Sequence, residues 1–150
     1  MEPNPNLSTD GAASERAPTD TVRAFLSAME RLDFDDTLAL ASPGIRWVNA
    51  PITSAKGKES FARACRGMFK GVTRFEVEYL DIHERGDGVV YTDRIDTIEG
   101  RGLNMRIAVQ GEFQVRDGLI VDWVDRFSWR QAIGDIVKSL PAILAHPFRR

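Results

Sequence analysis

The chain has 150 residues, of which 43% are hydrophobic and 28% charged, and its net charge is −2. These values are typical of one soluble globular domain, and a near-neutral chain without a basic cluster argues against nucleic-acid binding. No apolar run reaches the ~18 residues of a membrane-spanning helix, and the N-terminus lacks a basic start followed by an apolar stretch. We therefore expect a cytoplasmic protein without membrane insertion.

The few cysteine and histidine residues point to no metal site. Cys65 is the only cysteine, and the two histidines, His83 and His146, are far apart in the sequence. No cluster has the spacing of metal ligands, so we expect neither a metal nor a cofactor. Cys65 falls on the apolar side of a predicted helix, which favours a role in the core over one as a nucleophile.

The first part of the chain predicts a tail followed by helices. Residues 1–18 are rich in proline, serine, alanine and acidic residues, so we expect a disordered tail, with a single domain over 19–150. After it, Thr19 or Asp20 can cap a helix whose apolar stripe comprises Val22, Phe25, Leu26, Met29 and Leu32. A short second helix over 35–40 is expected to end at the Ser-Pro-Gly of 42–44.

The rest of the chain predicts mainly strands. A strand over 45–51 is followed by a helix with Phe61, Cys65, Met68 and Phe69 on one side. From Val72 the apolar period is two, and turns at 85–88, 99–102 and 116–118 separate four long strands. We interpret Gly111, inside the third of these, as a bulge or bend, and the residues after Trp129 as a helix. The order predicts an α+β fold in which a strongly curved, mostly antiparallel sheet packs helices on its concave side, as a cone with a pocket.

Two of these strands carry charges where apolar side chains are expected. Because side chains alternate along a strand, Arg94 and Asp96 share a face with Val90, Thr92 and Ile98. Asp125 is the only charge on a face predicted to hold Leu119, Val121, Trp123 and Phe127.

A buried carboxylate without a partner is costly, so Arg94 is the natural counter-ion for Asp125 and could bridge it to Asp96. Such a trio offers an acid and a base held by a permanent cation. The alternative is an ordinary structural ion pair. Trp47 and Asn49 share a face of the earlier strand and could together hold a water molecule. The alternative for them is a packed tryptophan and an asparagine at a strand end.

The element order resembles the NTF2-like cone, shared by nuclear transport factor 2, ketosteroid isomerase and scytalone dehydratase. The charged segments 92–96, 111–115 and 122–127 look like those of the limonene-1,2-epoxide hydrolase family within the SnoaL-like superfamily. The segment 46–51 resembles the water-binding strand of that family. The resemblance covers roughly residues 20–130.

The resemblance implies one-step hydrolysis of an epoxide without a covalent enzyme intermediate. Asp125 would be the general base, Asp96 the protonated acid, and Arg94 the bridge between them. Asn49 would hold the attacking water. Where the family commonly has a tyrosine, this chain has Trp47, which can donate to that water but cannot accept from it.

The expected substrate is a small apolar epoxide, because the predicted pocket comprises residues of the Phe61 helix together with Val90, Leu103 or Met105, Ile107 and Trp123. Three alternatives remain: an isomerase, dehydratase or polyketide cyclase on the same cone; an epoxide-opening cyclase; and a binding module without catalysis. We also expect a homodimer packed through the outer sheet face, where Tyr91, Asp93 and Ile95 mix apolar and charged groups.

Overall fold

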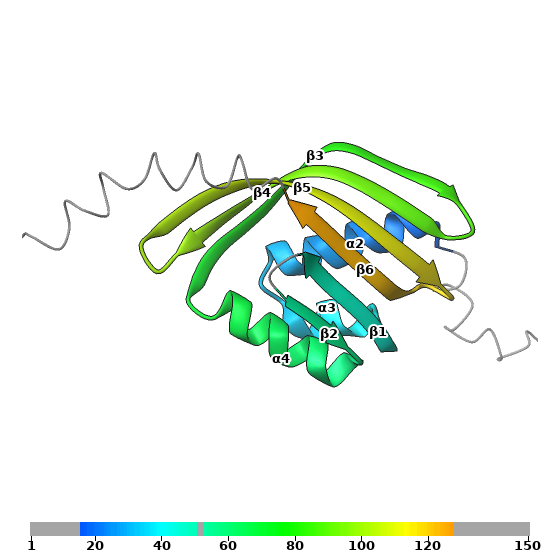
Figure 1. The fold of residues 1–150 in the computed structure, drawn as a ribbon, viewed down its shortest axis with the longest axis horizontal. Coiled ribbons are helices and arrows are strands. Elements are labelled where there is room, and N and C mark those ends of the chain that lie inside the picture. The colour runs from blue at the N-terminus through cyan, green and yellow to red at the C-terminus, as the bar shows by residue number, and fades with distance from the viewer. Residues whose placement is uncertain (1–15, 51–52, 128–150) are drawn as a thin grey trace, which may run out of the picture.

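The computed structural model describes residues 16–50 and 53–127, which form three helices and a six-stranded sheet (Figure 1). The predicted tail, apart from its last residues, and the predicted helix after Trp129 lie outside these ranges. The elements are α2 (Pro18–Glu30), α3 (Phe34–Ala39), β1 (Ala41–Ala50), β2 (Thr53–Lys56), α4 (Lys58–Phe69), β3 (Val72–Gly86), β4 (Val89–Gly100), β5 (Leu103–Arg116) and β6 (Leu119–Phe127).

The sheet has the strand order β2-β1-β6-β5-β4-β3, and every neighbouring pair is antiparallel except β1 and β6. Its long strands curve over the helices, which lie on the concave side (Figure 1). The predicted α+β class is therefore confirmed. The parallel pair places β1 directly beside β6, so the first and last strands of the described chain lie next to each other in the sheet.

Three tight hairpins build the meander of β3, β4, β5 and β6. Their central pairs are Asp87-Gly88, Arg101-Gly102 and Asp117-Gly118, and both residues of each pair have positive φ, between 52° and 76°. Two such residues define a type I′ turn, which matches the twist of paired strands and favours Asp or Asn followed by Gly. All three predicted turns are confirmed.

The first helix begins two or three residues earlier than predicted. Pro18 is its first residue, Ala17 precedes it, and no side chain caps it, so the predicted cap at Thr19 or Asp20 is wrong. Proline suits this position because its fixed φ is already helical and the missing N–H has no helical partner there. The predicted stripe holds from Val22 to Met29, all buried, whereas Leu32 follows the helix.

Two further expectations for this region are corrected. The second helix covers Phe34–Ala39, with Asp33 as its cap accepting the Asp36 N–H at 3.0 Å. Ser42, Pro43 and Gly44 are not its stop but lie in β1, where the pairing with β6 is irregular between Ala41 and Arg46. The four-residue β2 was not predicted, because its Thr-Ser-Ala-Lys sequence is mostly polar and exposed.

The core is an aromatic cluster between the helices and the sheet. Phe25 of α2 contacts the rings of Phe61, Phe113 and Trp123, and Trp47 contacts Phe61 and Trp123. Cys65 is buried beside them, and burial raises the pKa of its thiol to about 12. A thiol with that pKa is not a nucleophile at neutral pH, which agrees with the predicted core role.

Candidate active site

The inner face of β4 carries the predicted charges. Val90, Thr92, Arg94 and Asp96 alternate with outward-facing residues and are all buried, so the alternation predicted for this strand is confirmed. Arg94 is 1% exposed and Asp96 6%. These are charged groups in the interior of the protein, where polar groups need partners.

The face predicted for β6 is only partly right. Trp123 and Asp125 are buried as expected, but the preceding buried residue is Ile120, not Leu119 or Val121. The cause is a bulge: Val115 pairs with Ile120 and Gln114 with Asp122, so Val121 has no partner on β5. One extra residue in a strand reverses the face of everything before it.

Arg94 joins the two strands through all of its donors. Its Nε and Nη2 donate to the two oxygens of Asp96, at 2.9 and 3.2 Å. Its Nη1 and Nη2 donate to Asp125, at 3.1 and 2.5 Å, and Nη1 also donates to Thr92 Oγ1 at 2.9 Å. A guanidinium has five N–H groups, and each has an acceptor here. The guanidinium is therefore fixed in position and direction.

Two carboxyl groups share this single cation, and burial alters the protonation of one of them, Asp96. Burial raises the pKa of Asp96 to about 6; Asp125 and Glu30 raise it too, against the lowering effect of Arg94. For Arg94 itself, burial lowers the pKa, but Asp125 and Asp96 together raise it above its ordinary value. The site thus holds a permanent cation beside one carboxyl group that can carry a proton near neutral pH.

Asp125 is held from a second side by Trp123. The indole Nε1–H donates to Asp125 Oδ1 at 2.7 Å, and Oδ1 also accepts from Arg94 Nη1. Oδ2 accepts only from Arg94 Nη2 among the described residues. Oδ2 therefore keeps a lone pair for a further hydrogen bond, and Oδ1 does not.

The trio faces a cavity of about 290 Å³ with mainly apolar walls. The walls come from α2, β1, α4 and the long strands, and besides the trio they comprise Met29, Trp47, Asn49, Met68, Phe69, Phe75, Ile98, Met105, Ile107, Val109, Trp123 and Phe127. A concave, largely apolar pocket with a few converging polar groups is the usual form of a small-molecule site.

Trp47 and Asn49 reach this cavity from β1. Asn49 pairs in register with Asp125, and Trp47 with Trp123, across the parallel pair of strands. The Asn49 amide lies 3.8 Å from Met68 Sδ, a weak contact. Trp47 Nε1 is buried and has no hydrogen-bond partner among the described residues. Both residues therefore retain hydrogen-bonding capacity beside Asp125.

Only some of the other predicted pocket residues line the cavity. Met105, Ile107 and Trp123 line the cavity, but Val90 and Phe61 are fully buried in the core instead, and Leu103 is 45% exposed at a hairpin end. Met29, Phe75 and Phe127 are lining residues that were not predicted as such. Met68 and Phe69 also line the cavity, and both belong to the Phe61 helix, whose residues were expected at the pocket.

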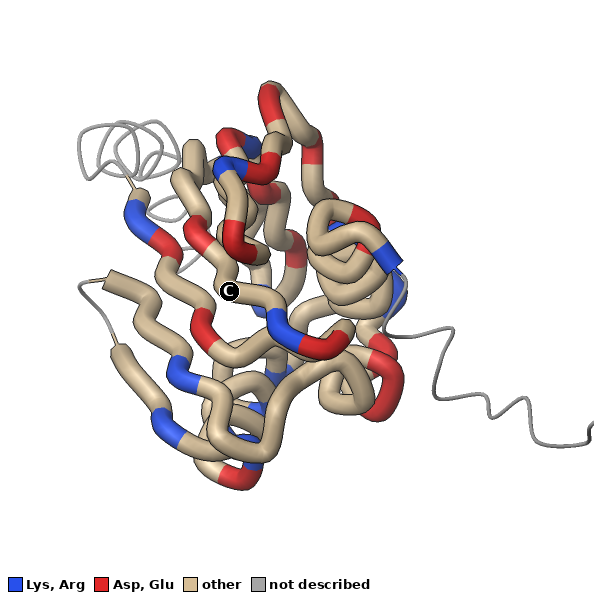
Figure 2. The backbone as a smooth tube through the Cα atoms, turned by 90° about the vertical axis from the view of Figure 1, so that its right-hand side faces the viewer, with Lys and Arg blue, Asp and Glu red and all other residues tan. Residues whose placement is uncertain are grey.

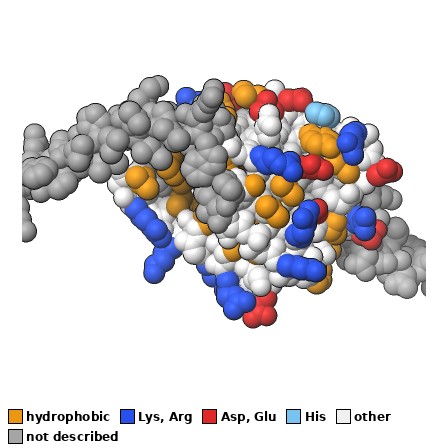
Figure 3. All heavy atoms as spheres, in the orientation of Figure 1, with side chains coloured by type: hydrophobic (Ala, Val, Ile, Leu, Met, Phe, Trp, Pro, Cys, Tyr) orange, Lys and Arg blue, Asp and Glu red, His pale blue; other side chains and the backbone are white. Residues whose placement is uncertain are grey.

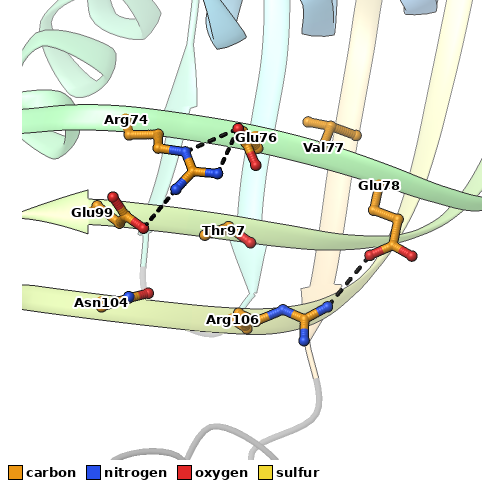
Figure 4. Close-up of a pocket in the computed structure, with 8 residues that line it drawn as sticks. All are labelled: Arg74, Glu76, Val77, Glu78, Thr97, Glu99, Asn104 and Arg106. Atoms are coloured by element: carbon orange, nitrogen blue, oxygen red, sulfur yellow. Dashed lines mark hydrogen bonds and ion pairs between the residues drawn. The ribbon is translucent and has the colours of Figure 1, made fainter.

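The outer face of the sheet offers a second hollow, lined by charged residues of β3, β4 and β5 (Figure 4). Arg74 pairs with Glu76 and Glu99, and Arg106 with Glu78; all are well exposed to solvent except Glu99, which is half-buried. Ion pairs of this kind contribute little energy, and Val77 is the one apolar residue among those that line the hollow. His83 also lies outside the cavity, paired with Asp81 at 2.7 Å on the protein surface.

Charges of both signs are spread over the described elements (Figure 2), and the face seen in Figure 3 mixes cationic, anionic and hydrophobic side chains.

Within residues 16–50 and 53–127, no group of acidic, histidine or cysteine side chains could hold a metal ion. No helix in these ranges is long and apolar enough to cross a bilayer.

Fold and cavity together define a cone-shaped domain of the NTF2-like class with a buried Asp-Arg-Asp group in an apolar pocket. Residues 16–139 match the model of the limonene-1,2-epoxide hydrolase catalytic domain, and the chain belongs to this family. The predicted family and the predicted epoxide hydrolase type of catalytic domain are therefore confirmed.

Individual relatives agree with this assignment. The chain is 32% identical to epoxide hydrolase EphG of Mycobacterium tuberculosis over 125 residues, which cover 82% of this chain and 81% of that protein. A solved LEH-like epoxide hydrolase of M. tuberculosis matches with a TM-score of 0.76 at 29% identity, covering 86% of this chain and 96% of its own. A Shewanella denitrificans protein described as a SnoaL-like polyketide cyclase shares the fold alone, with a TM-score of 0.75 at 11% identity over 81% and 97% of the chains.

Proposed function

We propose that the domain adds water to a small apolar epoxide and releases a vicinal diol in one step. The observation that carries the proposal is the fully paired Arg94 between Asp96 and Asp125, facing an apolar cavity. An acid and a base on opposite sides of one cation can act on the two ends of the same reaction, each contributing ~10²–10⁴-fold.

In the proposed step, Asp125 Oδ2 takes a proton from water, because its free lone pair makes it the available base. The water oxygen attacks an epoxide carbon and the carbon–oxygen bond of the ring breaks. Asp96 gives its proton to the departing oxygen, which becomes the second hydroxyl. Asp125 ends protonated and Asp96 ionised, so one net proton transfer between them restores the starting state.

Asn49 and Trp47 are proposed to hold the water. Asn49 is the register partner of Asp125, and its amide can both donate and accept. Trp47 has a buried N–H without a partner among the described residues, and such a donor costs about 1–3 kcal/mol until it is satisfied. A water accepting from Trp47 would direct its own protons toward Asp125 and the Asn49 carbonyl.

The proposed substrate is apolar and small because of the cavity. Met29, Met68 and Met105 line its walls with flexible thioether chains, which adapt to ligands of different shape. At ~30 Å³ for each water-sized group, a cavity of about 290 Å³ has room for roughly ten heavy atoms.

The test is a single turnover of a panel of apolar epoxides with enzyme in excess in ¹⁸O-labelled water. Direct attack by water puts the label into the diol of the first turnover. A covalent aspartyl ester would leave that diol unlabelled, and an epoxide-opening cyclase would release a cyclic ether without label. If every epoxide survives unchanged, the proposed hydrolysis is wrong.

The matching variants are Asp125→Asn and Asp96→Asn, each expected to lower diol formation by ~10²–10⁴-fold without unfolding the protein. Asp122→Asn is the control, because Asp122 lies on the same strand but on the opposite face, paired with Arg46 at 2.8 and 2.9 Å. Equal losses in all three variants would contradict the assigned roles.

A further inference from the structure

A row of three residues crosses the sheet beneath the Arg94 guanidinium. Thr92 on β4 pairs with Gly111 on β5, and Gly111 pairs with Asp125 on β6. Adjacent strands lie about 4.8 Å apart, so Arg94 must extend over the whole width of β5 to reach Asp125. Gly111 is the residue it passes over.

Gly111 leaves space that this crossing requires. A Cβ at this position would lie 2.5 Å from Arg94 Nη1, 2.5 Å from Thr92 Oγ1 and 2.9 Å from Asp125 Oδ1. Carbon atoms do not approach polar atoms this closely, so any side chain at Gly111 would displace the guanidinium, its hydroxyl partner or its carboxylate partner.

The backbone itself does not need glycine here. Gly111 has no positive φ, and its pairing with both β4 and β6 is regular at this point, so the predicted bulge is wrong. Glycine in a strand interior costs about 0.5–1 kcal/mol relative to alanine. A glycine that weakens its strand without serving a turn marks a place where another group comes close.

Thr92 completes the arrangement. Its Oγ1 accepts a hydrogen bond from Arg94 Nη1 at 2.9 Å. Thr92 is buried, with 3% of its surface exposed. The two N–H groups of Nη1 are thus divided between Thr92 on one side of Gly111 and Asp125 on the other. Without the hydroxyl, one buried N–H would lose its acceptor, at a cost of about 1–3 kcal/mol.

We propose that Gly111 and Thr92 are positioning residues that together form a seat for the Arg94 guanidinium, and that this seat sets the geometry between Asp96 and Asp125. The proposal rests on the proposed function, because the bridge matters only if both carboxyl groups react. Neither residue touches the substrate; both act through Arg94.

The first test compares Gly111→Ala with Gly44→Ala. Gly44 is also in a strand, has no positive φ, and has no atom within 4 Å of an added Cβ. We expect Gly111→Ala to lower kcat for epoxide hydrolysis by ~100-fold, the cost of misplacing a catalytic group by about 1 Å, and Gly44→Ala to stay within about twofold. Wild-type kcat in Gly111→Ala would overturn the proposal.

The second test separates positioning from simple loss of folding. Thr92→Val keeps the shape of the side chain but removes the acceptor, and we expect it to lower kcat by at least about tenfold; Thr92→Ser should recover most of that loss. In Gly111→Ala the alkaline limb of kcat/KM should move to higher pH, because Arg94 lowers the pKa of Asp96 while Asp125 and Glu30 raise it. A reduced folded fraction with an unmoved limb would contradict the proposed role.

A readout without substrate distinguishes failure of the seat from failure of the proposed function. The Arg94 Nε–H, assigned through bonds to its backbone, should be protected from exchange in the NMR spectrum of the wild type and of Gly44→Ala, because it donates to Asp96. It should shift and lose protection in Gly111→Ala. If the wild type opens no epoxide but the signal responds in this way, the seat stands and the reaction is wrong; an unchanged signal overturns the seat.

Discussion

At the scale of single residues, the site differs from an ordinary buried ion pair in its count of charges. Two carboxyl groups share one guanidinium, so the trio is neutral only when one of them carries a proton. Burial favours that neutral form. The pKa of Asp96 is therefore raised to about 6, well above the ordinary ~3.9 of aspartate.

This predicts the pH dependence of the rate. If Asp96 must be protonated to act as the acid, kcat/KM, which reports on the free enzyme, falls tenfold per pH unit above about pH 6. Glu30 raises the pKa of Asp96, so Glu30→Gln should lower that pKa and move the alkaline limb to lower pH. The Gln carbonyl can still accept the Val77 N–H that Glu30 accepts at 3.1 Å. The measurement is kcat/KM from pH 4 to 9.

Glu78→Gln is the control for Glu30→Gln. Glu78 is an exposed residue of β3 that pairs with Arg106 on the outer face of the sheet. Its variant should leave the limb where it is. A limb that stays in place in Glu30→Gln, or moves to higher pH, would contradict the influence of Glu30 on Asp96.

At the scale of elements, the strands were predictable where the alternation is unbroken. On β4, five inward positions from Val90 to Ile98 follow the period of two, and this alone brought Arg94 and Asp96 onto one face. On β6, the bulge at Val121 carries no glycine or other marker, so the face predicted for Leu119 is wrong while that of Trp123 and Asp125 is right. The bulge predicted at Gly111 is wrong for the opposite reason: the pairing is regular there, and the missing side chain leaves space for Arg94.

Local sequence patterns could not predict which strands lie next to each other in the sheet. The contact between Arg94 and Asp125 skips β5, and the approach of Asn49 to Asp125 depends on a parallel pairing of the first and last strands of the described chain. Both are long-range features of the sheet order. The charged motifs and the family resemblance, not the periodicity, were what pointed to them.

The bulge yields a prediction from two single-residue deletions. Val121 is the unpaired residue of β6, so deleting it should restore regular alternation and leave Trp123 and Asp125 facing inward. Deleting Val124 instead should turn Asp125 to the outer face. We expect the Val121 deletion to keep diol formation within about tenfold of the wild type and the Val124 deletion to lose it, measured at equal concentrations of folded protein. Loss in both deletions would mean that the bulge itself is needed.

At the scale of the whole molecule, the two faces of the sheet differ in what covers them. The concave face buries the aromatic core and the cavity, whereas the outer face remains without cover from the described helices (Figure 1). Half-buried Tyr91, Ile95, Ala108 and Val124 lie on that outer face among exposed charges. An apolar patch surrounded by polar groups is the usual composition of an interface between proteins.

We therefore keep the prediction of a two-fold homodimer packed through the outer face. In such a dimer each patch meets its own copy, so light scattering at micromolar concentration should give twice the chain mass of 16.8 kDa. Ile95→Glu should give a monomer, because two copies of the new carboxylate would meet near the axis without a partner. Leu103→Glu is the control, since Leu103 is exposed at a hairpin end away from the patch. A monomeric wild type would contradict the predicted dimer. A dimer that Leu103→Glu dissociates and Ile95→Glu does not would mean that the interface lies elsewhere.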